Sequence, residues 1–317
     1  MIRKIKEVIR RLTDKRPIIK VQVTELAHSN LLKKRCALIT GGTSGIGFAI
    51  AAAYLKAGCN IVITGRSQER IDKAKKKLSI IDDKLSVIGI KLDNTQVHTF
   101  EESFMKILEK VEEKGIPYVD ILVNNAGVNY KGMPNVIEEE YDKVLDTNLK
   151  GVFFLSQMFG KYLVKNKIQG NILNVASASS LRPADSAYTV SKWGVRGLTL
   201  GLAKSLAKYG ITVNGIAPGP TATPMMIHDK TDDLFLDRLP LGRYIMPEEI
   251  SNMAVMLVSN LGKSIMGDIV YMTGGAGVLT YDDIVTRCTL FFLINKYKYN
   301  VYNSRKCSHS SSFVKAV

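Results

Sequence analysis

A glycine-rich turn near the start of the chain constrains the fold more than any other segment. Residues 36–51 read CALITGGTSGIGFAIA, an apolar run followed by spaced glycines and then by a strongly helix-forming stretch. A strand that turns on glycines into a helix directs backbone N–H groups and the positive end of the helix dipole at an anion. The segment therefore predicts a phosphate-binding turn. The alternative is that the glycines serve only a sharp connection.

Apolar runs of strand length recur along the chain and alternate with helical patterns. Seven such runs lie at 37–39, 60–64, 85–91, 119–123, 170–175, 211–216 and 268–272. This alternation is typical of an α/β fold, and the length suffices for a large core. We therefore predict one domain over residues 36–284, a doubly wound, Rossmann-like parallel sheet of about seven strands with helices on both faces.

Basic segments flank the predicted domain. Of the net charge of +15, residues 1–35 contribute +8 and residues 285–317 contribute +6, which leaves +1 for the domain. We therefore expect no nucleic-acid partner for it. Residues 1–35 are predicted to be a basic amphipathic extension, and residues 285–317 a basic tail that is disordered or non-native. A helix over residues 1–16 would either touch an anionic membrane surface or pack on protein.

The second strand-like run ends without an acidic residue. Residues 60–64 are followed by Gly65, Arg66 and Ser67. Dinucleotide-binding folds that prefer NAD place an acid near this point to bind the ribose hydroxyls, whereas an arginine accommodates the 2′-phosphate of NADP. We therefore predict a preference for NADP(H) over NAD(H), with Arg66 as its selector. The alternative is that Arg66 is an ordinary solvated charge that opens the next helix.

A tyrosine and a lysine stand four positions apart in SAYTVSKWG, residues 186–194. Residues at i and i+4 share one face of a helix, so Tyr188 and Lys192 are predicted to point into the same space. A neighbouring ammonium group favours the phenolate and moves the hydroxyl toward pH values at which it exchanges protons. The pair indicates acid–base chemistry, with a solvated helix face as the alternative.

Six motifs, in order, resemble those of the short-chain dehydrogenase/reductase family across about residues 36–280. They are the TGxxxGxG turn at 40–47, the NNAG sequence at 124–127, Asn148, Ser177, Tyr188 with Lys192, and Pro218-Gly219 followed by Thr223. The resemblance implies that the catalytic residues are Asn148, Ser177, Tyr188 and Lys192. The cofactor-binding residues predicted in this way are Gly41, Thr43, Ser44, Gly45, Ile46, Gly47, Arg66, Asp93, Asn125, Ala126, Gly127, Tyr188, Lys192, Pro218, Gly219 and Thr223.

The catalytic serine has two candidates. Ser177 lies eleven residues before Tyr188, a shorter gap than is most common in the family that the chain resembles. Anchoring the comparison on the sequence Leu-Arg-Pro at 181–183 assigns the role to Ser177. Ser179 is the alternative, and the other serines of this stretch are expected to bond to local backbone.

The predicted function is that of an NADP(H)-dependent oxidoreductase that interconverts a ketone or aldehyde and an alcohol, with Tyr188 as acid/base. A catalytically silent NADP(H)-binding sensor or scaffold is the alternative, although it has no need of proton-transfer groups held together. The expected partners are a small-molecule substrate and, by family resemblance, further copies of the chain in a homodimer or homotetramer. Residues 218–243, which include Met225 and Met226, are expected to cover the substrate.

Neither the four cysteines nor the four histidines have a metal-ligand spacing, so we predict no metal site. Cys36 and Cys59 fall at the starts of strand-like runs and are expected to be small buried residues. This cysteine usage suits a reducing compartment. We predict a cytoplasmic protein, peripheral to a membrane only if residues 1–16 bind one.

Overall fold

The computed structural model describes residues 19–24, 27–130, 132–226 and 233–279. At its centre is a sheet of seven parallel strands in the order β3-β2-β1-β4-β5-β6-β7. The strands are β1 (Cys36–Ile39), β2 (Asn60–Gly65), β3 (Val87–Lys91), β4 (Ile121–Asn124), β5 (Asn171–Val175), β6 (Thr212–Pro218) and β7 (Ile269–Met272). Each of the seven predicted runs overlaps one of these strands, which confirms the predicted fold class.

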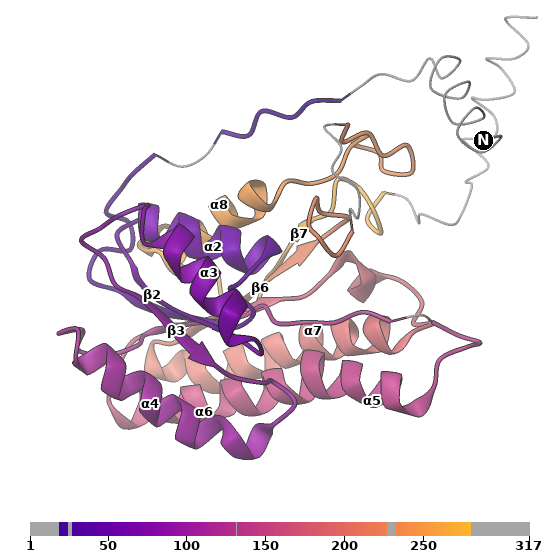
Figure 1. Cartoon of the computed structure of the whole chain (residues 1–317). Helices are drawn as coiled ribbons and strands as arrows, with labels where there is room; N and C mark the ends of the chain where they lie inside the picture. The colour runs from indigo at the N-terminus through magenta and orange to yellow at the C-terminus, as the bar shows by residue number, and fades with distance from the viewer. Residues whose placement is uncertain (1–18, 25–26, 131, 227–232, 280–317) are drawn as a thin grey trace, which may run out of the picture.

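Helices cover both faces of the sheet (Figure 1). One layer contains α2 (Gly45–Lys56), α3 (Gln68–Leu78) and α8 (Pro247–Val258). The other layer contains α4 (Phe100–Glu112), α5 (Glu138–Leu145), α6 (Gly151–Lys165) and α7 (Ala187–Leu206). Because both faces are covered, the strands need apolar side chains in both directions, which explains why their residues are mostly apolar.

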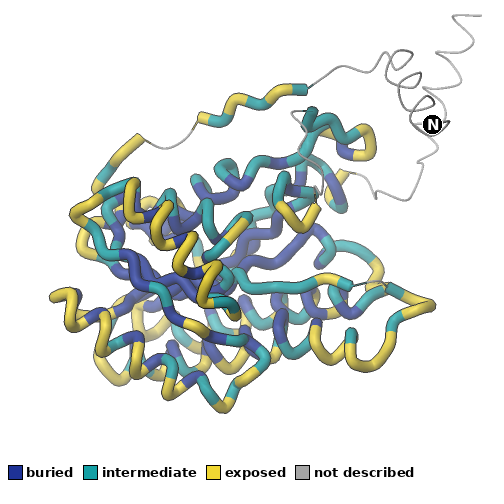
Figure 2. The backbone as a smooth tube through the Cα atoms, viewed as in Figure 1, coloured by how far each residue is buried: buried dark blue, intermediate teal, exposed yellow. Residues whose placement is uncertain are grey.

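The side chains of the strands divide between hydrophobic clusters on the two faces of the sheet, as the alternation of a strand requires. In β1, Ala37 and Ile39 pack into the core shared with α2 and α8. Cys36 and Leu38 point the other way, into the core shared with α4 and α6. The sheet is accordingly the most deeply buried layer of the molecule (Figure 2).

The direction of winding reverses beside β1. Leu38 of β1 is paired with Val62 of β2 on one side and with Leu122 of β4 on the other. The chain builds outward to β3, then crosses over and builds outward again from β4 to β7. In open α/β sheets, the carboxyl ends of strands at such a reversal form a crevice. The fold therefore brings the loops after β1 and β4 to the place where a ligand would bind.

At the amino ends of the strands, on the side of the sheet opposite this crevice, Arg35 joins several segments. Its guanidinium forms an ion pair with the Asp120 carboxylate and donates to Asn171 Oδ1 at 2.6 Å and to the Val258 carbonyl at 3.2 Å. Asp120 also accepts from the backbone N–H of Cys36 at 2.9 Å. Burial raises the pKa of Asp120, and the charge of Arg35 opposes that shift. The network fixes the amino ends of β1, β4 and β5 against the end of α8.

The flanking segments are described only in part. Residues 19–24 run outside the sheet, on the side of α8 (Figure 1). The amphipathic helix predicted for residues 1–16 and the tail predicted for residues 285–317 lie outside the described residues, so both stay predictions. Among the described helices, none combines the length and the apolar character that crossing a membrane requires.

Candidate active site

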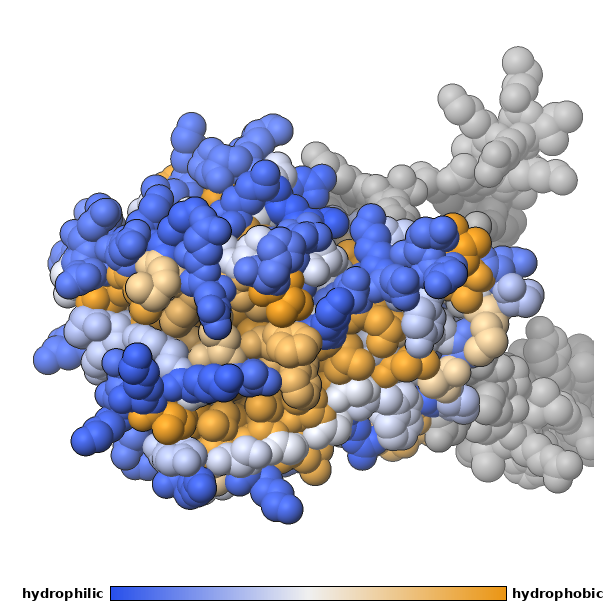
Figure 3. All heavy atoms as spheres, turned by 90° about the horizontal axis from the view of Figure 1, so that it is seen from below, coloured by the Kyte–Doolittle hydropathy of each residue, from blue (hydrophilic) through white to orange (hydrophobic). Residues whose placement is uncertain are grey.

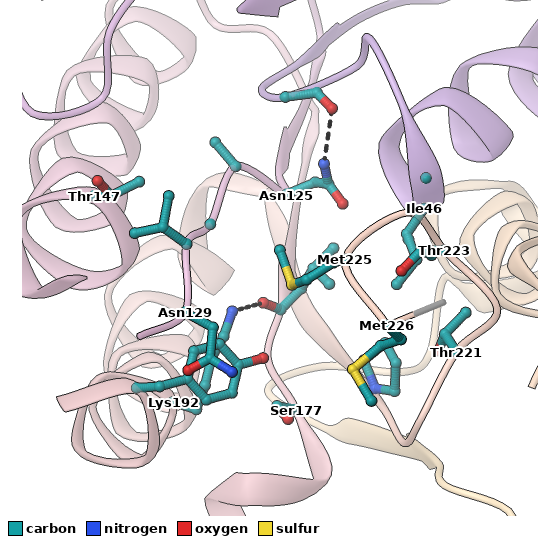
Figure 4. Close-up of a pocket in the computed structure, with 18 of the residues that line it drawn as sticks. Ile46, Asn125, Asn129, Thr147, Ser177, Lys192, Thr221, Thr223, Met225 and Met226 are labelled. Carbon is teal, nitrogen blue, oxygen red and sulfur yellow. Dashed lines mark hydrogen bonds between the residues drawn. The ribbon is translucent and has the colours of Figure 1, made fainter. Parts of the chain in front are cut away.

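A cleft of about 1240 Å³ follows the carboxyl ends of the strands. Ligand sites for small molecules typically measure about 300–1,000 Å³, so this cleft has room for a dinucleotide together with a substrate. All the predicted site residues line it except Gly47 and Asn148, which are buried beside it. Figure 4 shows part of the cleft, with Ile46, Asn125 and Thr223 in one region and Asn129, Ser177 and Lys192 in another.

The glycine turn forms one wall of the cleft. Gly41 and Gly45 have φ values of +65° and +55°, a conformation that favours glycine. Helix α2 begins at Gly45, so its N-terminal N–H groups and the positive end of its dipole face the cleft. The residues that line this wall, Gly41, Thr43, Ser44, Gly45 and Ile46, fit a bound diphosphate.

Gly47 lies beneath the turn, where it leaves space for the Asn125 side chain. A Cβ atom on Gly47 would lie 2.3 Å from Asn125 Nδ2 and 2.5 Å from the Gly41 carbonyl oxygen. The Asn125 amide occupies that space because it donates to the carbonyls of Thr40 (3.0 Å) and Gly41 (3.2 Å). Thr40 Oγ1 in turn accepts from the backbone N–H groups of Asn125 (3.0 Å) and Ala126 (3.1 Å). These bonds hold the ends of β1 and β4 together at the cleft.

A buried amide layer continues from this point across the sheet. Asn124 Nδ2 donates to Ser156 Oγ on α6 and to Asn174 Oδ1 on β5, each at 2.8 Å. Asn174 Nδ2 donates to Thr199 Oγ1 on α7 at 2.9 Å. Asn124 of the NNAG motif thus ties the fourth strand to its neighbours. The layer sets the register of β4 against β5, because a slip by one residue would leave buried amides unpaired.

Basic and acidic groups meet at the far end of the cleft, after β2 and β3. Arg66, Ser67 and Arg70 line it from one side, and Asp93 lines it from the other. Ser67 caps α3, since its Oγ accepts from the Arg70 N–H. Asp93 Oδ1 is oriented by the N–H and Oγ1 of Thr95, both at 3.0 Å. The sequence reasoning missed Ser67 and Arg70, although a serine before a helical run is a recognisable N-cap signal.

Tyr188 and Lys192 lie together on the first turns of α7, as the spacing predicted. Ser186 caps this helix, its Oγ accepting from the Thr189 N–H at 3.2 Å. The Lys192 Nζ atom lies 5.5 Å from the centre of the Tyr188 ring and donates to the Val175 carbonyl at 2.8 Å (Figure 4). The strand β5 therefore holds the ammonium group in place beside the phenol.

The electrostatics of this pair differ from the expectation. Burial raises the pKa of Tyr188, and a hydrogen bond from the Ser177 side chain opposes that shift. Burial also lowers the pKa of Lys192 from 10.5 to about 8. The expectation considered only the attraction between the two groups, whereas the largest effect on both pKa values is desolvation. Tyr188 is therefore a phenol at neutral pH, ready to donate a proton.

Ser177 lines the cleft together with Tyr188 and is the serine that opposes the rise of the Tyr188 pKa. It ends the loop after β5 and caps the short 3₁₀ turn Ala178–Leu181, where its Oγ accepts from the Ser179 N–H at 3.1 Å. Ser179 also lines the cleft. The choice of Ser177 over Ser179 stays a prediction.

Asn148 connects the wall of the cleft to α7. It lies in a π-helical segment, Asp146–Lys150, and its side chain exchanges two hydrogen bonds of 2.9 Å with the backbone of Val128. Its Nδ2 also donates to Ser191 Oγ at 3.2 Å, and Ser191 donates to the Tyr188 carbonyl at 2.6 Å. Asn148 thus contacts the helix that carries Tyr188 without lining the cleft. Ser191 was missed, because a mid-helix serine gives no distinctive signal.

The loop after β6 closes the remaining side. Pro218, Gly219 and Thr223 line the cleft, and a Cβ atom on Gly219 would lie 2.5 Å from the Thr273 carbonyl oxygen. The side chains of Met225 and Met226 lie over the cleft between these walls (Figure 4). Of the segment 218–243 expected to cover the substrate, residues 227–232 lie outside the described residues. Arg182 and Arg238 also line the cleft and were not predicted.

The site has the parts of a nucleotide-binding oxidoreductase. A glycine turn at a helix N-terminus fits a diphosphate, and a tyrosine, a serine and a lysine meet at the other end, where they can exchange a proton. Within the described ranges there is no group of three or more His, Cys, Asp or Glu residues arranged to hold a metal ion.

Comparison with known proteins gives the family. Residues 35–233 match the short chain dehydrogenase family, and the chain belongs to it. The 3-oxoacyl-(acyl-carrier-protein) reductase of Thermotoga maritima is 33% identical over 249 residues, 77% of this chain and 98% of that protein. The 3alpha-hydroxysteroid dehydrogenase of Mediterraneibacter gnavus is 35% identical over 253 residues, 78% of this chain and 98% of that protein.

Solved structures agree with the family assignment. A putative gluconate dehydrogenase from Agrobacterium tumefaciens superposes with a TM-score of 0.70 at 31% identity, covering 80% of this chain and all of that one. Levodione reductase superposes with a TM-score of 0.71 at 28% identity, covering 78% of this chain and all of that one. The protein is thus an NAD(P)-dependent dehydrogenase/reductase that acts on CH–OH and C=O groups.

Proposed function

We propose that the protein is an NADP(H)-dependent oxidoreductase that interconverts a ketone or aldehyde and the corresponding alcohol, with Tyr188 as its acid and base. The observation that carries this proposal is the meeting of Ser177, Tyr188 and Lys192 at one end of a cleft that has Arg66 at its other end. The relatives described above have names of enzymes that act on a ketone or a secondary alcohol, which supports the same reaction class.

The proposed proton transfer follows from the arrangement of the side chains. The substrate carbonyl oxygen accepts hydrogen bonds from Ser177 and Tyr188, and the Tyr188 phenol gives up its proton to that oxygen in reduction. Lys192, held by the Val175 carbonyl, binds the nicotinamide ribose and stabilises the phenolate that remains. Asn148 positions the backbone around Val128 and α7 through its three hydrogen bonds. A bound nicotinamide supplies or accepts the hydride.

The proposed preference for NADP(H) rests on the charges after β2. Arg66 and Arg70 line the cleft there, and β2 ends in Gly65 rather than in an acid. A guanidinium group pairs with a phosphate through two parallel hydrogen bonds, so this end suits the 2′-phosphate that distinguishes NADP from NAD. A related short-chain dehydrogenase from Burkholderia cenocepacia, 28% identical, was solved in complex with NADP.

Fluorescence titration with NADPH and with NADH tests the cofactor preference. We expect tighter binding of NADPH, and we expect Arg66→Asp to weaken it by about tenfold or more, since a charge-assisted hydrogen bond contributes about 1.5–3 kcal/mol. The same change should leave NADH binding nearly unaltered. Equal affinities of the wild-type protein for both cofactors would contradict the preference.

The reaction itself is tested by NADPH oxidation with a panel of ketones that includes oxoacyl thioesters, oxosteroids and keto-sugar acids. Tyr188→Phe should abolish turnover while NADPH still binds, because the change removes only the hydroxyl group. Tyr209→Phe is the matched control, since Tyr209 is exposed and has Lys208 over its ring at 5.0 Å. Cofactor binding without turnover of any member of the panel would favour the sensor alternative.

A homodimer or homotetramer is proposed from an apolar surface. Phe153 and Phe154 on α6 and Trp193 and Leu200 on α7 are each at least 40% exposed. Figure 3 shows apolar side chains gathered among charged ones on the side where α4 and α6 lie. Exposed apolar clusters of this kind are typical of interfaces between proteins. Sedimentation velocity should give a dimer or larger, and Phe154→Asp should shift it toward monomer.

A cytoplasmic location is proposed from the cysteines. Cys36 and Cys59 are buried free thiols, and burial raises the pKa of each, so both are unreactive core residues. Free, unpaired thiols of this kind are compatible with a reducing compartment, where disulfides are rare. Cell fractionation tests the location, and recovery of the protein with membranes would point instead to the basic residues 1–16.

A further inference from the structure

We propose that residues 19–24, which precede the catalytic domain, position the substrate-side wall of the cleft. The expected effect on the substrate rests on the proposed function, whereas the geometry rests on the hydrogen bonds that this segment makes. This segment precedes the part of the chain, residues 35–233, that matches the family. Its role would therefore be a property of this chain rather than of that matched region.

Residues 19–24 lie against the protein by one face. Ile19, Val21 and Val23 are half-buried, whereas the intervening Lys20, Gln22 and Thr24 are exposed. An alternation of period two is the burial pattern of an extended segment with one face packed. The segment is also fixed at its far end, where the Thr24 carbonyl accepts from Asn252 Nδ2 of α8 at 2.8 Å.

A ladder of backbone hydrogen bonds leads from this segment toward the cleft. The Leu234 N–H donates to the Ile19 carbonyl at 3.1 Å, and the Tyr244 N–H donates to the Leu234 carbonyl at 2.9 Å. The next residue, Ile245, donates to the Pro220 carbonyl at 2.9 Å and accepts from the Ala222 N–H at 2.8 Å. Four chain segments are thus joined side by side.

Two parts of this ladder, the Pro220 segment and the turn between Leu234 and Tyr244, contribute to the wall of the cleft. Pro220 and Thr221 line it directly, and Thr223 follows them. Leu234 and Tyr244 form the two ends of a turn that is closed further in by the Leu236 N–H, which donates to the Gly242 carbonyl at 3.0 Å. Arg238, at the tip of that turn, lines the cleft.

The turn between Leu234 and Tyr244 is held by hydrogen bonds on two sides. On its inner side, Arg243 makes two hydrogen bonds of 2.8 Å to Glu249 of α8, and Leu241 donates to the Gly274 carbonyl. On its outer side, Ile19 supplies the acceptor for Leu234, and Asp233 Oδ1 accepts from the Ile19 N–H at 3.4 Å. Residues 19–24 therefore support the outer side of this wall through Ile19.

The test uses two variants of the full-length protein, each with one added negative charge in residues 19–24. Val21→Asp puts the charge on the packed face, and Gln22→Asp puts the same charge on the exposed face. We expect Val21→Asp to raise the KM for the carbonyl substrate by about tenfold, the equivalent of one or two lost hydrogen bonds. The dissociation constant of NADPH should change far less, because most of its predicted contacts come from the loops after β1 to β4.

A second readout does not depend on catalysis. Amide hydrogen exchange at Leu234 should accelerate in Val21→Asp and stay at the wild-type rate in Gln22→Asp. If the wild-type protein reduces no carbonyl compound, the proposed function fails, and this exchange measurement still decides the positioning role. Wild-type exchange and KM in Val21→Asp, or equal effects of both variants, would overturn the proposal.

Asn252→Ala provides an independent variant should Val21→Asp fail to fold. Asn252 is half-buried on α8, away from the residues that line the cleft, and its replacement removes the hydrogen bond to Thr24. Asn166→Ala is the matched control, since Asn166 is an exposed asparagine that bonds only locally, to the Tyr162 carbonyl at 2.8 Å. We expect faster exchange at Leu234 and a higher substrate KM in Asn252→Ala alone. No difference between the two asparagine variants would refute the role of the segment.

Discussion

Replacing Lys192 by methionine should abolish catalysis and yet stabilise the fold. Lys192 is 5% exposed, and burial lowers its pKa from the ordinary value of 10.5 to about 8. That difference corresponds to about 3 kcal/mol of penalty for keeping the ammonium group charged inside the protein. Methionine has a similar length and no charge to bury. The variant loses the hydrogen bond to the Val175 carbonyl, which contributes about 1 kcal/mol. The net gain at neutral pH is about 2 kcal/mol.

The gain in stability of Lys192→Met should shrink as the pH rises. Below pH about 8 the lysine is protonated in both the folded and the unfolded chain, so the wild-type protein bears the whole penalty. Between about 8 and 10.5 the unfolded chain binds more protons than the folded one, so wild-type stability rises with pH. Above 10.5 both states are neutral, and the advantage of the variant disappears.

Urea unfolding without cofactor, followed by circular dichroism across this pH range, measures the effect. Lys204→Met is the control, because Lys204 is an exposed lysine on the same helix. It should leave stability nearly unchanged at every pH. If Lys192→Met is less stable than the wild-type protein at neutral pH, or if its advantage does not shrink as the pH rises, the reasoning from burial is wrong.

Two further predictions concern the cleft. Gly47→Ala should weaken NADPH binding by about tenfold or more, because its Cβ would displace the Asn125 amide from the turn, and overpacking of this kind costs about 1–3 kcal/mol. Gly197→Ala is the control in the same titration, since a Cβ there meets no atom within 4 Å. Because burial raises the pKa of Tyr188, kcat for reduction should stay level through neutral pH and fall only in alkali, whereas kcat for alcohol oxidation should rise with pH. If steady-state measurements show that kcat for reduction rises in alkali, or that kcat for oxidation falls as the pH rises, Tyr188 is excluded as the proton donor.

The sequence predicted the layout of the sheet well because its signals are local. Each strand contains a short, mostly apolar run, and the TGxxxGxG turn combines a strand end with a helix start within a few residues. The Tyr188/Lys192 spacing likewise depends only on helix geometry. These features need no knowledge of the tertiary structure.

Features that depend on burial could not be predicted in this way. The pKa of Tyr188 moves opposite to the expected direction because burial, which a sequence does not reveal, raises it. Gly47 was predicted to contact the cofactor but lies beneath the turn, where it leaves space for Asn125. Arg70 and Arg238 reach the cleft through the packing of α3 and of the turn after Leu234, and neither has a sequence signature.

The two sides of the cleft have separate mechanical supports. The glycine turn and Arg66 rest on β1 and β2 in the interior of the sheet, whereas Arg238 and the Pro220 segment are held from outside by hydrogen bonds that end at Ile19. On the proposed cofactor assignment, a change of substrate would leave the glycine turn and Arg66 in place, and only Pro218, Gly219 and Thr223 share a loop with the altered wall. The relatives that span the same domain have names referring to oxoacyl, steroid and gluconate compounds, as this independence would allow. For directed evolution, the supports at residues 19–24 and 234–245 offer a way to alter selectivity while the redox partner stays the same.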